Sequence, residues 1–168
     1  MPCTMRITHE LRYDAPPSAV YAMLADPAFR EEVGKAMDVA RQDISIDRTA
    51  EGMDVRIDMD QRTQGIPSFA RRIVGDRTRV VQSERWEHEE GADLQLQIPG
   101  KPGHIRGRIT LSETDDGSGG TVESFDGEAV IKVPFVGGRL EGLIEKLFTA
   151  GMDTEQSLGE RWLTGDRA

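Results

Sequence analysis

The sequence lacks the marks of an exported or membrane-bound protein. It contains one cysteine, Cys3, among 168 residues. An intrachain disulfide is therefore excluded, and a reducing compartment such as the bacterial cytoplasm is expected. The opening MPCTMRITHE has no basic segment followed by an apolar run, and no later stretch approaches the ~20 apolar residues that cross a bilayer. We expect a cytoplasmic protein without a transmembrane segment.

Positive charge is also scarce. The chain has 30 acidic and 21 basic residues, which gives a net charge of -9. This balance repels nucleic acid and anionic lipid headgroups. We therefore predict no nucleic-acid partner.

The usual catalytic and metal-binding motifs are missing as well. The three histidines, His9, His88 and His104, form no helical i, i+4 pair and have no cysteine partner, so no metal site is predicted. The chain has no G-x-S-x-G nucleophile motif. We assign no catalytic residue and expect no cofactor.

One glycine pair resembles a phosphate-binding turn. Gly137 and Gly138 precede an apolar helical repeat, but Arg139, Leu140 and Glu141 follow them in place of lysine and serine or threonine. An acidic residue in the first helical turn competes with a bound anion. We favour a structural corner between a strand and a helix, with a phosphate site as the alternative.

Alternating polarity predicts several strands. Residues 5–13 alternate between apolar and polar side chains, and GMDVRIDMDQ, residues 52–61, has one apolar and one charged face. Weaker alternation occurs at 39–47, 79–87, 93–98, 105–111 and 121–133. This pattern indicates an antiparallel sheet with one face in water.

Helical spacing appears in four other segments. SAVYAMLAD follows a proline pair and ends at Asp26, and residues 28–37 repeat the spacing. A shorter helix is predicted within 67–76, with Ser68 as its N-cap and Gly75 as its end. From Gly138 an apolar stripe persists for about seven turns; we expect glycines 151 and 159 to loosen that helix.

The predicted order is one strand, two short helices, about six strands and a long helix. This order is typical of an α+β fold, and residues 1–168 are predicted to form a single domain. A sheet with one apolar face must be covered, and only the last helix is long enough to cover it.

Two segments carry a family resemblance. The segments APPSAVYAMLADPAF and VPFVGGRLEGLIEKL, in this order of elements, resemble the START-like helix-grip (SRPBCC) superfamily, which includes the birch-pollen allergens and polyketide cyclases. The resemblance covers about residues 5–164. It is narrowest with an uncharacterised, mainly actinobacterial branch of unknown function. The residues that match this branch are Val133, Pro134, Phe135, Val136, Gly137, Gly138, Leu140 and Glu141.

The resemblance implies a helix-grip fold: a curved antiparallel sheet of about seven strands wrapped around the long C-terminal helix, with two short helices after the first strand. It also implies a cavity between sheet and helix that holds apolar molecules, and no universal catalytic residues. We therefore predict binding or carrying of a small hydrophobic or lipid-like ligand. The oligomeric state is left open.

The predicted ligand-binding residues face the space between the sheet and the last helix. His9 is a candidate polar anchor, with a hydrogen-bonded core histidine as its alternative. Phe69 and Ile73 are expected to act as a lid. Glu155 either reaches the cavity or extends to its edge. The expected apolar wall consists of Leu11, Val55, Ile57, Met59, Leu94, Leu96, Ile109, Phe148 and Met152. Ordinary core packing is the alternative for these methionines.

Two other functions remain open. A cyclase- or dehydratase-like enzyme needs at least two polar side chains inside the cavity, and the sequence offers only His9 and Glu155. A protein-interaction module would instead show a filled cavity and an exposed apolar patch. A binding protein is favoured over an enzyme.

Overall fold

The structure, a computed structural model, describes residues 3–101, 103–132 and 137–165. Its strands are β1 (Cys3–Tyr13), β2 (Val39–Arg48), β3 (Gly52–Arg62), β4 (Arg77–Glu87), β5 (Gly91–Gln97), β6 (Gly103–Glu113) and β7 (Thr121–Ile131). Its helices are α1 (Pro17–Leu24), α2 (Pro27–Ala36), α3 (Ser68–Val74) and α4 (Gly137–Leu163).

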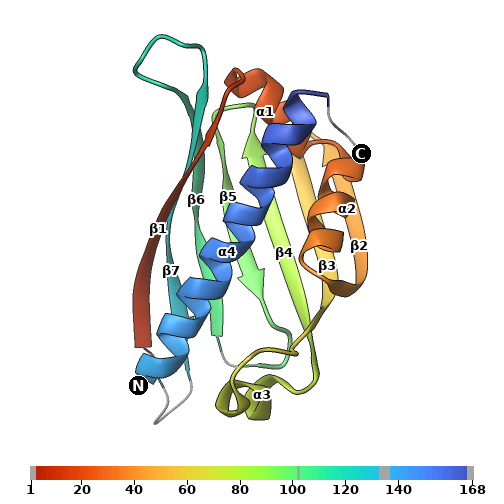
Figure 1. Cartoon of the computed structure of the whole chain (residues 1–168), viewed down its shortest axis with the longest axis vertical. Helices are drawn as coiled ribbons and strands as arrows, with labels where there is room; N and C mark the ends of the chain where they lie inside the picture. The colour runs from red at the N-terminus through yellow and green to blue at the C-terminus, as the bar shows by residue number, and fades with distance from the viewer. Residues whose placement is uncertain (1–2, 102, 133–136, 166–168) are drawn as a thin grey trace.

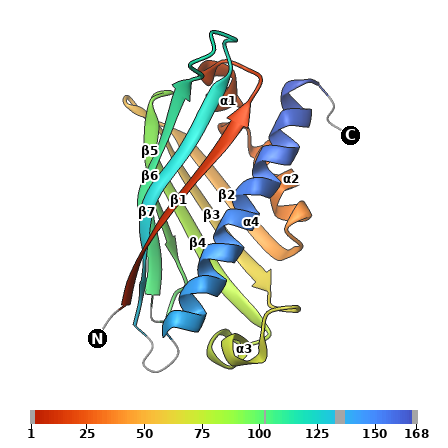
Figure 2. The ribbon, with the colours of Figure 1, turned by 60° about the vertical axis from the view of Figure 1, so that its left-hand side comes forward.

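The seven strands form one curved antiparallel sheet in the order β1-β7-β6-β5-β4-β3-β2. Helix α4 crosses one face of this sheet diagonally, as Figures 1 and 2 show from two sides. Helices α1 and α2 lie beside the C-terminal half of α4, and α3 lies at the opposite end of the sheet (Figure 1). The predicted α+β helix-grip architecture is confirmed.

Proline and aspartate set the boundaries of the first two helices. Pro17 and Pro27 occupy the first turns of α1 and α2, where a missing N–H costs nothing. The Asp26 carboxylate accepts a hydrogen bond from the Ala28 backbone N–H at 2.9 Å, which caps α2 directly after α1 ends.

Helix α3 begins differently from the prediction. Pro67, not Ser68, occupies the N-cap position, and no side chain caps the helix. The predicted Ser68 cap is therefore wrong, because the extended Pro67 already places Ser68 inside the first turn. Gly75 ends the helix with a positive φ of 85°, as predicted.

The two faces of the sheet differ as the alternation predicts. The face toward α4 carries buried apolar side chains such as Ile7 and Val55. The opposite face carries exposed ion pairs, among them Arg6 with Asp126 at 2.8 Å. Such exposed pairs are screened by solvent and contribute little to stability. The buried face therefore accounts for most of the stability of the sheet.

Two glycines make room for an aromatic ring inside the fold. A Cβ atom added at Gly107 or Gly127 would lie 2.7 or 2.6 Å from Cζ of Phe125. The ring of Phe125 therefore lies over both glycines, against β6 and its own strand. On its other side it meets Phe148 of α4, with ring centroids 4.7 Å apart. This aromatic pair joins the middle of α4 to the sheet.

Helix α4 passes through Gly151 and Gly159 without a break, so the expected loosening is not seen. Gly159 is buried against the sheet and α1. A Cβ atom there would lie 2.7 Å from Cε1 of Tyr13 and 3.0 Å from Cε of Met23. Gly159 therefore serves close packing between α4, β1 and α1.

We expect Gly159→Ala to destabilise the protein by about 1–2 kcal/mol, because overpacking outweighs the gain of up to ~1 kcal/mol in helix propensity. Gly142→Ala is the matched control, since Gly142 is exposed on the same helix and a Cβ there meets nothing within 4 Å. That control should stabilise the protein by ~0.5–1 kcal/mol. Urea unfolding compares the two, and stabilisation by both variants would contradict the close packing at Gly159.

None of the helices in the described part of the chain is both long and apolar enough to span a membrane.

Candidate functional site

A buried ion pair lies between α2 and β4. Nη1 and Nη2 of Arg30 donate to Oε1 and Oε2 of Glu84 at 3.0 and 2.7 Å, and Nε donates to the Leu24 carbonyl at 2.8 Å. Both side chains are almost fully buried. The fork of the guanidinium matches the two carboxylate oxygens, which is the geometry of a strong pair.

Glu84 receives two further donors from its own strand. Gln82 Nε2 donates to Oε1 at 2.6 Å, and Trp86 Nε1 donates to Oε2 at 2.7 Å. Burial alone would raise the pKa of Glu84, but the charge of Arg30 and these hydrogen bonds outweigh burial and lower it. The pair is therefore a neutral, saturated unit that holds α2 on the sheet.

Three further polar groups, Tyr13, Glu123 and Glu155, lie close to this ion pair; we call them the acidic site. In the β1–β7 register Leu11 faces Glu123 and Tyr13 faces Thr121, so Tyr13 and Glu123 are diagonal neighbours on the inner face. The Tyr13 ring lies against α4 at Gly159, one turn beyond Glu155. The acidic site thus joins β1, β7 and α4.

The acidic site is buried at Tyr13 and Glu123, and two of its polar atoms make no hydrogen bond with the described residues. Tyr13 is 1% exposed and Glu123 is 2% exposed. Within the described part of the chain, neither the Tyr13 hydroxyl nor Oε2 of Glu123 has a hydrogen-bond partner. Buried polar atoms without partners are rare and costly. Glu155 is only partly buried, which leaves one edge of the acidic site open to solvent.

The two carboxyls hold their protons unusually tightly. Burial raises the pKa of Glu155 to about 7; Arg30 and contact with Glu123 counteract this shift, and the charge of Glu84 adds to it. Burial, followed by the charges of Glu155 and Glu84, raises the pKa of Glu123 well above its ordinary value. Burial, followed by the charges of Glu123 and Glu155, also raises the pKa of Tyr13. The acidic site therefore retains protons near neutral pH.

An apolar layer lies directly beside the acidic site. Phe125 follows Glu123 by two residues on β7, and Phe148 precedes Glu155 by two turns on α4. Five of the half-buried apolar side chains that pack against the main core are here named the apolar layer: Met59, Leu96, Ile105, Phe148 and Met152. They are more exposed than Tyr13 and Trp86, which are each 1% exposed.

A family model described as "Protein of unknown function (DUF2505)" matches residues 8–163. The chain belongs to this family. No curated protein matches the sequence.

Several solved structures share the fold of this DUF2505 protein. TTHA0849 from Thermus thermophilus is 17% identical, with 98% of this chain and 100% of that chain covered and a TM-score of 0.66. The Zhui aromatase/cyclase from Streptomyces sp. R1128 is 13% identical, with 95% of each chain covered and a TM-score of 0.64. A truncated norcoclaurine synthase from Thalictrum flavum is 15% identical, with 96% of this chain and 94% of that chain covered and a TM-score of 0.62. At these identities the likeness establishes the helix-grip fold and not a shared reaction.

The predicted wall residues of the DUF2505 chain divide into two groups. Five lie in the main core and are almost fully buried: Leu11, Val55, Ile57, Leu94 and Ile109. Four belong to the half-buried apolar layer: Met59, Leu96, Phe148 and Met152. The second group has more room to contact a ligand. Their role in ligand binding stays a prediction.

The predicted lid residues pack at the end of the fold. Phe69 and Ile73 of α3 are half-buried against a small cluster of Ala70, Ile131 and Leu140. The Arg139 guanidinium lies 4.3 Å from the centroid of the Phe69 ring. Helix α3 therefore packs against the end of β7 and the start of α4. The glycines of the predicted corner, Gly137 and Gly138, begin α4. Residues 133–136 before them lie outside the described residues.

His9 faces α4 and is engaged there. Its Nε2 lies 2.7 Å from Oδ1 of Asp153, and the two side chains are 24% and 63% exposed. The histidine therefore ties β1 to α4 at the rim of the interior. Glu155, the other polar candidate, lies deeper and belongs to the acidic site.

The sequence prediction missed Tyr13, Arg30, Glu84 and Glu123 as site residues. The alternation of side chains along β4 and β7 could have identified the two glutamates as inward-facing, because each lies two positions from another inward-facing residue. Glu84 lies between Gln82 and Trp86 on β4, and Glu123 precedes Phe125 on β7. Arg30 follows the buried Phe29 and had no comparable signal.

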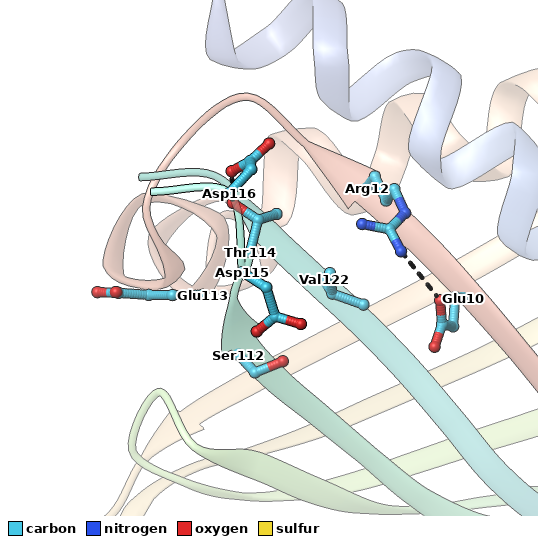
Figure 3. Close-up of a pocket in the computed structure, with 8 residues that line it drawn as sticks. All are labelled: Glu10, Arg12, Ser112, Glu113, Thr114, Asp115, Asp116 and Val122. Carbon is cyan, nitrogen blue, oxygen red and sulfur yellow. Dashed lines mark hydrogen bonds and ion pairs between the residues drawn. The ribbon is translucent and has the colours of Figure 1, made fainter. Parts of the chain in front are cut away.

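Two hollows defined by described residues both lie on the face of the sheet turned away from α4. Figure 3 shows the smaller, of about 350 Å³, beside the β6–β7 turn, where Arg12 pairs with Glu10. The larger, of about 1220 Å³, is a broad groove lined by paired charges such as Arg6 and Asp126. Neither hollow lies between the sheet and α4.

Among the described residues no group of three or more histidine, cysteine, aspartate or glutamate side chains could hold a metal ion.

Proposed function

We propose that this protein binds a small hydrophobic ligand between the sheet and α4, in contact with the apolar layer. The observation that carries the proposal is the half-burial of Met59, Leu96 and Phe148, which pack against the main core and yet remain more exposed than its members. Long unbranched methionines adapt to guests of varied shape. Burying ~300 Å² of ligand supplies about 7 kcal/mol before association costs.

Access to the apolar layer is proposed at the end covered by α3. This helix is short and packs through the small Ala70, Ile131 and Leu140 cluster, separate from the main core. Its displacement would therefore expose the apolar layer without unfolding the sheet. Phe69 and Ile73 keep the lid role that the sequence predicts for them.

A ligand retained from the native host is the direct test. Native mass spectrometry of the purified protein should show an added mass that is released by solvent extraction. A clean spectrum at the mass of the chain, together with no binding of apolar probes, would contradict the proposal.

We predict that Phe148→Ala weakens binding of the neutral probe 2-(2-naphthyl)ethanol at least tenfold, because the ring contributes to the contact surface of the apolar layer. Leu147→Ala is the matched control, since Leu147 is the neighbouring residue on α4 and is 47% exposed. Probe fluorescence and urea unfolding are measured on both variants. Loss of stability without any change in probe affinity would mean that Phe148 serves only packing.

A second function, a cyclase- or dehydratase-like enzyme, gains support from the acidic site. Such an enzyme needs at least two polar groups inside the fold, and Glu123, Glu155 and Tyr13 provide three. A carboxyl with a pKa of about 7 suits proton transfer at neutral pH. Turnover of a polyketide-like thioester that is lost in Glu155→Gln would favour this function over binding alone. The interaction module has no comparable support, because Leu147 is the one exposed large apolar side chain among the described residues.

A further inference from the structure

The donors seen around the buried ion pair serve Glu84 and Leu24. Three of the five N–H groups of Arg30 donate to Leu24 or Glu84, and one N–H each of Gln82 and Trp86 donates to Glu84. The Tyr13 hydroxyl, a neutral donor beside Glu123, is buried without a hydrogen-bond partner in the described part of the chain. Oε2 of Glu123 is buried without a partner. The positive charge of Arg30 is paired with Glu84, so among the described residues the structure shows no cation paired directly with Glu123 or Glu155.

The apolar layer adjoins the acidic site along both β7 and α4. On β7 the step from Phe125 to Glu123 moves two residues along the same face, and on α4 the step from Met152 to Glu155 moves one turn. A guest whose apolar body contacts Phe148 and Met152 would place its end beside both carboxyls. The proposed ligand site would therefore have an apolar body, which we call the apolar slot, and an acidic end.

We propose that Glu123 and Glu155 form the head-group site for an organic cation, an ammonium group carried on a hydrophobic body. The proposal rests on the ligand-binding function proposed above and specifies the chemical class of the ligand. An ammonium group supplies three donors and one positive charge, which matches two carboxylates that the chain leaves without a cation. A carboxylate or phosphate head group is repelled by the same charges, and an alcohol supplies only one donor.

Three probes with one naphthalene body test the head group separately from the apolar body: 2-(2-naphthyl)ethylamine, 2-(2-naphthyl)ethanol and 2-naphthylacetate. At pH 8 the amine should bind at least tenfold more tightly than the alcohol, and the acetate should bind most weakly. Titration calorimetry gives the affinities. Equal affinity for amine and alcohol would overturn the cation site, for example because Tyr13 already satisfies Glu123, while leaving the apolar slot intact. Failure of all three probes to bind would overturn both proposals.

Proton linkage gives an independent readout. Because the carboxyls must ionise to hold the cation, amine affinity should rise several-fold from pH 5 to pH 8, and alcohol affinity should stay flat. The groups facing the pair are Arg30 of α2, Glu84 of β4 and Tyr13 of β1, with His9 and Asp153 at the rim. A flat amine profile would contradict the proposal.

The variant Glu155→Gln separates the acidic site from the overall negative charge of the protein. It should abolish the preference for the amine and its pH dependence while the alcohol still binds. Glu145→Gln is the matched control, because Glu145 is exposed on the same helix and removing it changes the net charge equally. An equal loss of preference in both variants would show a diffuse charge effect and would overturn the site.

Discussion

Replacing Glu84 by glutamine is expected to destabilise the protein by about 3–5 kcal/mol, the largest effect of any single change considered. The replacement leaves the Arg30 guanidinium buried without a counter-charge. In the wild type, Arg30, Gln82 and Trp86 all donate hydrogen bonds to the Glu84 carboxylate. The glutamine would present an N–H₂ group, itself a donor, to some of these donors. Urea unfolding at pH 7 measures the loss in free energy of unfolding.

A double-mutant cycle distinguishes a broken pair from simple loss of packing. Arg30→Met combined with Glu84→Leu removes both charges, and the double variant should recover most of the loss, because apolar replacements of buried pairs are often neutral. Asp126→Asn is the surface control. Both Asp126 and its partner Arg6 are exposed and screened by solvent, so the expected cost is small beside that of Glu84→Gln. A loss below ~1 kcal/mol for Glu84→Gln would contradict the structural role of the pair.

The sequence predicted the topology well because the fold depends on local patterns. The strict alternation of residues 52–61 corresponds to β3, and the stripe from Gly138 corresponds to α4. Both signals arise from side chains a few positions apart, which a single sequence displays directly. The error at Ser68 has a local cause too, since Pro67 before it already supplies the extended cap conformation.

The buried ion pair and most of the acidic site were hidden from the sequence because the burial of a polar side chain depends on distant segments. An inward glutamate on a strand usually extends to solvent, and Glu84 stays inside only because Arg30, 54 positions earlier, brings a matching charge from α2. Likewise His9 meets Asp153 across 144 positions. The alternation along a strand predicts which face of the sheet a side chain is on. It does not predict which side chain of another helix or strand will contact it.

The stability of the protein is expected to fall by about 2–3 kcal/mol as the pH rises from 5 to 8, owing to Glu155. The pKa of this group is about 7 in the folded chain against 4.5 ordinarily. Between these values the folded state binds more protons than the unfolded state, so rising pH favours unfolding. The contribution is fully present below a pH of 4.5 and is lost as the pH passes the folded pKa of about 7. The raised pKa of Glu123 acts in the same direction.

The carboxyls with lowered pKa act in a different window. Asp58, held by Arg79, and Asp116, held by Ser118, both have a pKa of about 2, so they reduce stability only in stronger acid. The Glu155→Gln variant has no ionisable group at this position. Its free energy of unfolding should therefore change much less between pH 5 and 8, and it should be more stable than the wild type at pH 8. Glu145→Gln should retain the wild-type slope. Parallel profiles for the wild type and Glu155→Gln would mean that Glu155 titrates as an ordinary surface carboxyl. The acidic site would then lack the desolvated carboxylate that is expected to make it bind an ammonium group more tightly than an alcohol.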